Sequence, residues 1–137
     1  MGTVYADLIL KNHSDLVMVR NGLLEEKDVR FLAVKAVVDT GAGTLVINQE
    51  QCRQLGLELQ KEHIVTLANN VKEKIKIADP IEICWKNRES VCLPWVVADS
   101  PEVLLGAIPL EEMDLIVDHG KQTITGRHGE EMHGYLF

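Results

Sequence analysis

The chain has 137 residues, of which 46% are hydrophobic and only 4% are aromatic. This length fits one domain, and the hydrophobic content excludes a disordered chain and requires a core of aliphatic side chains. The formal net charge is −7, from 14 Lys and Arg against 21 Asp and Glu, and the basic residues form no cluster. A nucleic-acid partner is therefore not expected.

The cysteines and the N-terminal residues bear on the compartment. No cationic segment leads into an apolar core at the N-terminus, and no apolar run approaches membrane-spanning length. Cys52, Cys84 and Cys92 are an odd number and form no CxxC pair. Cys84 and Cys92 could face one another across a hairpin, but core thiols in a reducing compartment are favoured. We therefore expect a soluble, cytoplasmic protein without a membrane partner.

Strands and turns alternate along the first half of the chain. Asn48 can cap a short helix, and Gly56 follows it as a C-terminal cap. Cys52 and Leu55 give this helix a small apolar face. The chain before this helix is expected to form strands at 3–10, 16–20, 31–38 and 44–47, a turn at 12–15 and an exposed connection at 21–28.

The second half continues in short strands. Asn69-Asn70 fits a two-residue hairpin turn, because Asn tolerates left-handed conformations. Residues 87–89 are expected to form another turn, and Pro109 suits the first turn of a second short helix. The expected strands are 63–67, 71–78, 81–86, 90–98, 103–105, 114–117 and 122–125. Many short strands with two short helices predict an all-β barrel or sandwich.

One stretch, Val37-Val38-Asp39-Thr40-Gly41-Ala42-Gly43, interrupts this pattern, because an apolar strand ends abruptly in a carboxylate, a hydroxyl and two glycines. A strand at 31–38 would present Asp39 on a tight loop. Gly41 and Gly43 permit backbone angles and close approaches that a side chain would forbid. Asp39 is then either a reagent or a loop cap, since Asp and Thr beside Gly are ordinary turn residues.

Two later features complete an ordered pattern: the hairpin tip Leu67-Ala68-Asn69-Asn70-Val71, and Leu104-Leu105-Gly106 before a short helix. With the Asp-Thr-Gly-Ala motif, this order resembles the retropepsin-like aspartic proteases (clan AA), the single-domain relatives of retroviral protease. The resemblance spans about residues 30–118. It implies an all-β, closed acid-protease-like barrel with one or two short helices. This domain would cover residues 1–125, followed by a tail or dimer-interface strand at 126–137.

The resemblance also implies an activity, that of an aspartic endopeptidase with Asp39, Thr40 and Gly41 as its catalytic residues. Two carboxylates must cooperate in that chemistry, one as acid and one as base. The chain contains one Asp-Thr-Gly, so the resemblance implies a homodimer with one Asp39 from each subunit. Thr40 would then bond across the two-fold axis. No metal or organic cofactor is implied.

The remaining site residues also follow from the resemblance. A peptide or protein substrate would contact Ala42 and Gly43 and the flap tip formed by Ala68, Asn69 and Asn70. From behind, Leu104, Leu105 and Gly106 would support the Asp39 loop. Gly43 and Ala107 stand where retroviral enzymes carry an acid and an arginine that pair, and the flap tip lacks glycine. Viral specificity is therefore not expected to transfer.

Other interpretations compete with the protease. The domain could be a dimeric binding or scaffolding module that kept the fold and lost turnover. The intact Asp-Thr-Gly argues against this, because a pair of carboxylates on the axis is electrostatically costly. A small β-protein with Asp39 as a loop cap is a third interpretation. His119, His128 and His133 show no metal-ligand spacing and are expected to be solvated loop residues.

Overall fold

The computed structural model describes residues 2–132, which form a nine-stranded sheet, a two-stranded ribbon and three short α-helices. The strands are β1 (Tyr5–Asn12), β2 (Phe31–Val38), β3 (Leu45–Ile47), β4 (Leu59–Thr66), β5 (Lys72–Ala78), β6 (Ile81–Trp85), β7 (Arg88–Cys92), β8 (Trp95–Val96), β9 (Leu104–Leu105), β10 (Leu115–Asp118) and β11 (Thr123–Gly126). The helices are α1 (His13–Arg20), the 3-10 turn η1 (Glu26–Asp28), α2 (Gln49–Gln54) and α3 (Ala107–Glu112). No helix among the described residues could cross a membrane.

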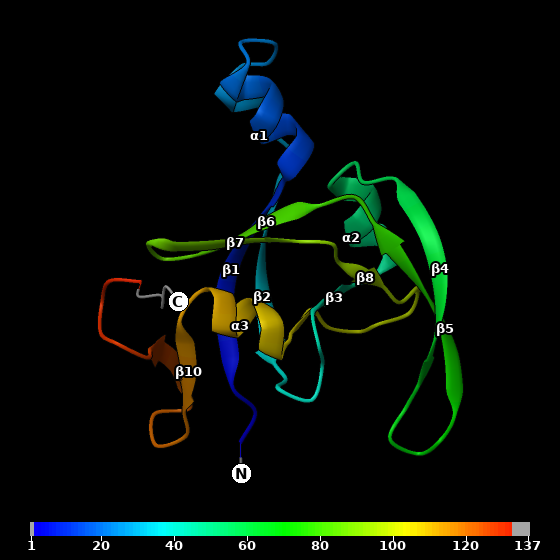
Figure 1. Ribbon diagram of the computed structural model, residues 1–137, viewed down its shortest axis with the longest axis vertical. Coiled ribbons are helices and arrows are strands. Elements are labelled where there is room, and N and C mark those ends of the chain that lie inside the picture. Colours follow the sequence, from blue (N-terminus) through cyan, green and yellow to red (C-terminus); the bar gives the residue numbers. More distant parts are fainter. Residues whose placement is uncertain (1, 133–137) are drawn as a thin grey trace, which may run out of the picture.

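The large sheet has the strand order β4-β5-β8-β3-β9-β2-β1-β6-β7 and is strongly curled (Figure 1). Its inner face carries an aliphatic core that includes Leu10, Ile47, Ile83 and Leu105. This confirms the prediction of a mostly-β protein with a mainly aliphatic core. Closure into a barrel is not confirmed, because β4 and β7 are edge strands in the pairing of the described residues.

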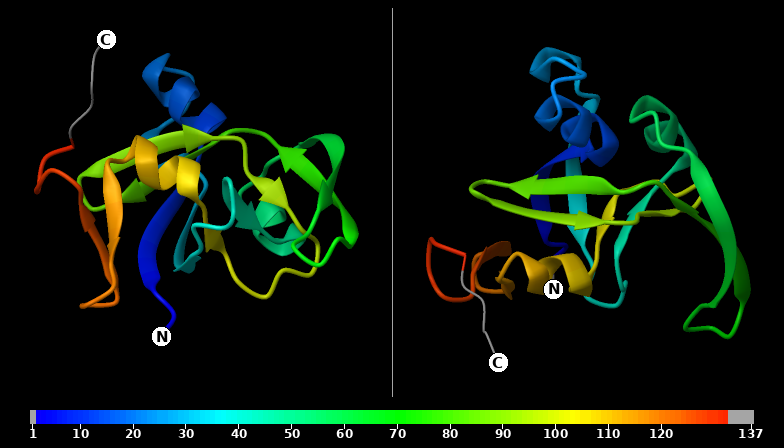
Figure 2. Two further views of the ribbon diagram at one scale, coloured as in Figure 1. Left: turned by 60° about the horizontal axis from the view of Figure 1, so that its bottom comes forward. Right: turned by 45° about the horizontal axis from the view of Figure 1, so that its top comes forward.

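The hairpin β4–β5 projects from the body beside the loop that joins β2 to β3 (Figures 1 and 2). β2 has the predicted bounds, and α2 has the predicted cap. The Asn48 side chain accepts a hydrogen bond from the Gln51 N–H, and the Asn48 N–H donates one to the Gln51 side-chain oxygen. Gly56 adopts φ +67°, as expected for a helix C-terminal cap.

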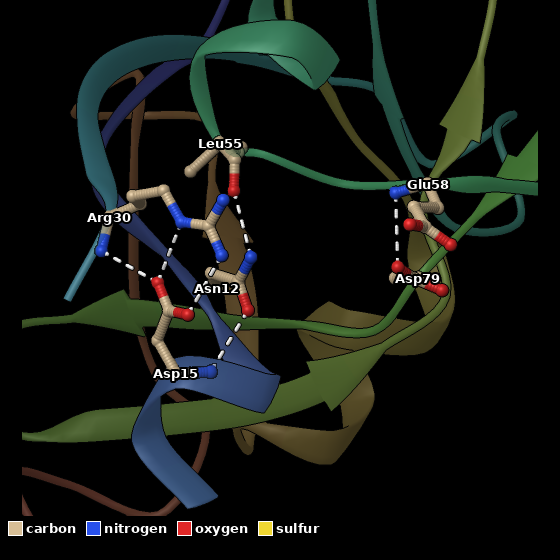
Figure 3. A network of polar contacts seen from close by, with 6 residues as sticks. All are labelled: Asn12, Asp15, Arg30, Leu55, Glu58 and Asp79. Atoms are coloured by element: carbon tan, nitrogen blue, oxygen red, sulfur yellow. Dashed lines mark hydrogen bonds and ion pairs between the residues drawn. The ribbon is translucent and has the colours of Figure 1, made fainter. Parts of the chain in front are cut away.

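The expected turn at 12–15 and the expected strand at 16–20 are wrong, because β1 runs to Asn12 and residues 13–20 form α1. The described residues therefore contain three short α-helices, not the expected one or two. The apolar run Leu16–Val19 fits a strand by composition, but capping and a distant ion pair decide its conformation. The Asn12 side chain caps the helix by accepting from the Asp15 N–H at 3.0 Å. The buried Asp15 carboxylate accepts two hydrogen bonds from the Arg30 guanidinium, both at 2.9 Å (Figure 3). Asp15 and Arg30 come together only when the chain folds, so the sequence segment alone does not reveal their ion pair.

The β6–β7 hairpin also differs from expectation. The turn falls at Lys86-Asn87, so Arg88 opens β7 and is buried, not placed in a turn. Its guanidinium donates to the carbonyls of Met113 and Asp114 at 2.9 and 2.6 Å, and to the carbonyl of Gly129. The buried arginine thereby ties the C-terminal ribbon to the sheet.

The structure also bears on the predictions made for the cysteines and for the C-terminal residues. Cys84 pairs in register with Glu89 and Cys92 with Ile81, so the two thiols are not opposite one another, and all three cysteines are free. His128 lies in an exposed turn, as expected, and its Nδ1 lies 2.9 Å from a buried Asp114 carboxylate oxygen. His133 and the apolar end of the expected tail, 135–137, lie outside the described residues.

Candidate active site

The Asp39 loop is held from behind by β9. This strand lies between β2 and β3, pairing parallel with β2 (Val38 with Leu105) and antiparallel with β3 (Leu45 with Leu105). The Asp39 N–H donates to the Leu105 carbonyl at 2.9 Å. The structure thus brings the two sequence motifs, separated by more than sixty residues, into direct main-chain contact.

Further hydrogen bonds fix the loop itself. Asp39 Oδ1 accepts from the Gly41 N–H at 2.9 Å, and the Asp39 carbonyl accepts from the Ala42 N–H at 3.0 Å. At the start of α3, the N–H groups of Ala107 and Ile108 donate to the carbonyls of Ala42 and Gly43, at 2.8 and 3.0 Å. Asp39 remains half-buried, and its Oδ2 has no hydrogen-bond partner within residues 2–132.

The glycines around this loop serve different purposes. A Cβ at Gly106 would lie 2.3 Å from the Thr44 carbonyl oxygen and 2.6 Å from that of Ala42, so only glycine fits there. A Cβ at Gly41 would lie 3.2 Å from Asp39 Oδ1, whereas one at Gly43 would meet nothing within 4 Å. Neither Gly41 nor Gly43 adopts a positive φ. The expected use of unusual backbone angles is therefore wrong, and the close approach occurs chiefly at Gly106.

A cleft of about 890 Å³ opens in front of Asp39, between its loop and the β4–β5 hairpin. Of the expected substrate-contacting residues, Ala42, Gly43 and Ala68 line it, together with Leu104 of the supporting motif. Asn69 and Asn70 do not. The cleft lining is Asp39, Gly41, Ala42, Gly43, Val46, Val65, Thr66, Leu67, Ala68, Glu73, Ile75, Trp95, Val97, Asp99, Ser100, Pro101 and Leu104.

The hairpin tip explains why the asparagines stand apart from the cleft. The turn is a three-residue loop, not the expected two-residue turn: the Leu67 N–H donates to the Val71 carbonyl, and the Asn70 N–H donates to the Leu67 carbonyl. Asn70 takes the left-handed position at φ 64°, and the Asn69 side chain accepts from the Val71 N–H at 3.0 Å. Both asparagines therefore shape the turn, while Leu67 and Ala68 face the cleft.

The sequence analysis did not predict several of the residues that line the cleft. Glu73 and Ile75 come from β5, and Val97 and Asp99 come from the segment after β8. The alternation of β5 could have revealed Glu73, because it shares the inward register of Ile75 and Ile77. Asp99 has no comparable local signal, since its position depends on the pairing of β5 with β8.

A second hollow, of about 580 Å³, lies on the other side of the Asp39 loop. Thr40 is exposed there, and its hydroxyl makes no hydrogen bond within the described part of the chain. The N-terminal segment, the end of β2, α3 and the β10–β11 ribbon with its flanking turns form the rest of its wall, through Gly2, Thr3, Val4, Val37, Val38, Ala107, Leu110, Glu111, Leu115, Ile116, Val117, His119 and Arg127. Asp39 thus stands between two hollows.

Possible metal ligands do not gather at Asp39. Among the described residues, one group could share an ion, formed by Glu82, Cys84 and Glu89 on the β6–β7 hairpin. Burial and the neighbouring Glu82 raise the pKa of the Cys84 thiol to about 12. This disfavours the thiolate that a metal requires.

Comparison with solved structures identifies the fold class. The chain is similar to the retroviral protease-like domain of Ddi1 from Leishmania major, with 15% identity and a TM-score of 0.57 over 91% of this chain and 88% of that chain. It is also similar to EIAV protease complexed with the inhibitor HBY-793 (19% identity, TM-score 0.49, coverage 80% and 86%). A third similar structure is a retropepsin-like aspartic protease from Rickettsia conorii (23%, 0.47, 85% and 85%). The fold is that of the retropepsin-like proteases.

The family follows from the sequence match. Residues 29–112, well over half of the chain, match the family model described as "gag-polyprotein putative aspartyl protease". The chain therefore belongs to this aspartyl protease family, and the resemblance drawn from the Asp-Thr-Gly-Ala motif is confirmed. Among curated proteins, no sequence matches the chain.

Proposed function

We propose that this protein is an aspartic endopeptidase that cleaves peptide bonds as a homodimer, with Asp39 of each subunit in a shared active site. One observation carries the proposal: the Asp39 carboxylate stands at the cleft on a loop that its own chain fixes from behind. The cleft has a volume of about 890 Å³ and a mostly apolar lining, which suits the binding of a peptide segment. Asp39, Thr40 and Gly41 are the proposed catalytic residues.

The chemistry requires a second carboxylate. Two carboxylates a hydrogen bond apart cannot both ionise, so one keeps a proton while the other stays charged, as is well known for aspartic proteases. The charged carboxylate takes a proton from a water as it attacks the peptide carbonyl, and the protonated one donates to the carbonyl oxygen. No covalent intermediate and no metal are required.

The second copy supplies that carboxylate. The cleft lining contains two other acids, Glu73 and Asp99, but neither sits on an Asp-Thr-Gly loop. The hollow beside Thr40 offers a surface where a second loop can approach Asp39, and the free Thr40 hydroxyl can bond across the two-fold axis. The β4–β5 hairpin would close over a bound peptide and exclude water. A cytoplasmic protein or peptide is the proposed substrate.

The test compares the wild type with Asp39→Asn, which keeps the side-chain shape and removes the acid. Each is incubated with a denatured protein mixture from acid to neutral pH, and its mass is recorded by light scattering. Asp28→Asn, the same change on the exposed η1 turn, is the matched control. We expect a dimer that cleaves in the wild type and in Asp28→Asn, and no cleavage by Asp39→Asn.

Three results contradict the proposal. Cleavage that persists in Asp39→Asn excludes this residue as the catalytic acid. A folded dimer that cleaves nothing favours the binding module. An active monomer excludes the shared site.

A further inference from the structure

The β5 strand carries an acid on its inward face. Along Lys72-Glu73-Lys74-Ile75-Lys76-Ile77, the lysines are exposed, while Ile75 and Ile77 are 2% and 9% exposed. Side chains of a strand alternate between its faces, so Glu73 shares the face of the isoleucines. A hydrophobic side chain would fit this register, yet the chain places a half-buried carboxylate there, in the wall of the cleft.

The charge of this carboxylate is not neutralised by its surroundings. Glu73 makes no ion pair or hydrogen bond with any residue between 2 and 132. The cleft lining contains the acids Asp39, Glu73 and Asp99, and none of its described residues is Lys, Arg or His. A cleft whose charged groups have one sign, between walls of low polarity, concentrates ligands of the opposite sign.

The other acid of the cleft wall, Asp99, lies in the turn that follows β8. Its turn is closed by a hydrogen bond from the Ser100 N–H to the Val97 carbonyl at 3.1 Å. The Asn48 side chain, at the start of α2, donates to the Ser100 carbonyl at 3.3 Å. The acid is therefore held beside the cleft without a side-chain partner in the described part of the chain, as Glu73 is.

Apolar groups form most of the remaining wall. Trp95 and Leu104 come from the sheet, Val97 follows β8, and Val65 and Leu67 come from the β4–β5 hairpin. These side chains bind aliphatic or aromatic groups through burial of apolar surface. The cleft thus combines an apolar surface with two uncompensated carboxylates besides Asp39.

We propose that the cleft selects peptides in which a lysine or arginine lies close to an apolar residue at the cleavage site, and that Glu73 and Asp99 are the residues that recognise the cation. Acidic peptides are disfavoured by like-charge repulsion. This specificity rests on the proposed protease function. In a homodimer, the two-fold axis duplicates both acids, so the preference extends to both sides of the cleaved bond.

The test uses a peptide series on one apolar background, in which a single position next to the cleavage site is Arg, Gln or Glu. Cleavage is measured as kcat/KM with the wild type, and binding is measured by fluorescence anisotropy with Asp39→Asn. In both assays we expect Arg to exceed Gln and Gln to exceed Glu, each by about 3- to 10-fold. Added salt should reduce these ratios, because it screens the charges.

Substitutions at Glu73 and Asp99 test whether these two residues cause the preference for cationic peptides. Glu73→Gln and Asp99→Asn should each lower the ratio of Arg to Glu peptides by about 3-fold or more, and the double variant should nearly abolish it. Lys74→Gln changes one charge on the outward face of the same strand and should leave the order of the peptides unchanged.

The outcomes separate the two proposals. Equal cleavage of Arg and Glu peptides overturns the charge preference and leaves the protease function standing. If the wild type cleaves no peptide, the proposed function fails, and the binding series with Asp39→Asn still decides whether the cleft prefers cations. A preference that survives in the double variant overturns the assignment to Glu73 and Asp99.

Discussion

Gly106→Ala tests whether the support behind the Asp39 loop determines its position. The added Cβ would lie 2.3 Å from the Thr44 carbonyl oxygen, 2.6 Å from that of Ala42 and 2.7 Å from the Thr44 nitrogen. All three atoms belong to the backbone, so no side chain can rotate away to make room. The loop and β9 must therefore separate.

Two contributions determine how much stability Gly106→Ala loses. Forcing a methyl group into a packed site costs about 1–3 kcal/mol. The separation also strains the hydrogen bonds from Ala107 to Ala42 and from Ile108 to Gly43, each worth about 0.5–1.5 kcal/mol. The free energy of unfolding should fall by about 2–6 kcal/mol, a large part of the total for a domain of this size.

Urea unfolding at one fixed protein concentration measures this loss, because the proposed dimerisation would make stability depend on concentration. Gly43→Ala is the matched control: it makes the same change in the same loop, where a Cβ would meet nothing within 4 Å. Its stability should stay within about 0.5 kcal/mol of the wild type. Equal stabilities of Gly106→Ala and Gly43→Ala would refute the reasoning.

Three further predictions concern buried polar groups and thiols. Asp15→Asn should lower the free energy of unfolding at pH 7 by about 1–2 kcal/mol, because Arg30, which is half-exposed, loses its ionised partner. Hydrogen bonds from Arg30 hold the pKa of Asp15 below its usual 3.8, so this stabilisation is present above pH 3.8 and is lost as the pH falls further. The urea midpoints of the two proteins should therefore converge in strong acid, and a gap that persists there would contradict the ion-pair explanation. Arg88→Met should cost about 2–4 kcal/mol in the same assay, because it leaves buried carbonyls without donors, and a change below about 0.5 kcal/mol would show that the buried guanidinium does not stabilise the ribbon. Burial raises the pKa of Cys84 to about 12 and that of Cys92 to about 11, so iodoacetamide at pH 8 should modify both in urea and neither in the folded protein, as judged by mass spectrometry.

The sequence predicted those features that depend on neighbouring residues. β2 and the loop after it follow from an apolar run that stops at Asp39. The cap of α2 follows from Asn48, Gln51 and Gly56, which interact within one short segment. Such local signals remain the same whatever the rest of the chain does, and the structure agrees with them.

Features that depend on distant contacts were missed. The apolar residues of α1 resemble a strand, and the ion pair of Asp15 with Arg30 that supports the helix lies outside this segment. The Asn12 cap is a local signal that the sequence analysis missed. The sequence analysis placed Arg88 in a turn, because the carbonyls to which it donates lie far from it in the sequence and leave no local signal. Part of the cleft was missed for the same reason: Asp99 reaches it through the pairing of β5 with β8.

The same distinction governs the proposed active site. The Asp-Thr-Gly motif specifies a carboxylate on a short loop with its own internal hydrogen bonds, but the bonds that anchor this loop to the body come from Leu105, Ala107 and Ile108, far along the chain. A free loop of this composition would sample many conformations, and holding a reacting group in one of them is a large part of catalysis. Residues that never touch a substrate, Gly106 above all, should therefore control activity through the position of Asp39. The second motif is as necessary to the proposed chemistry as the acid itself.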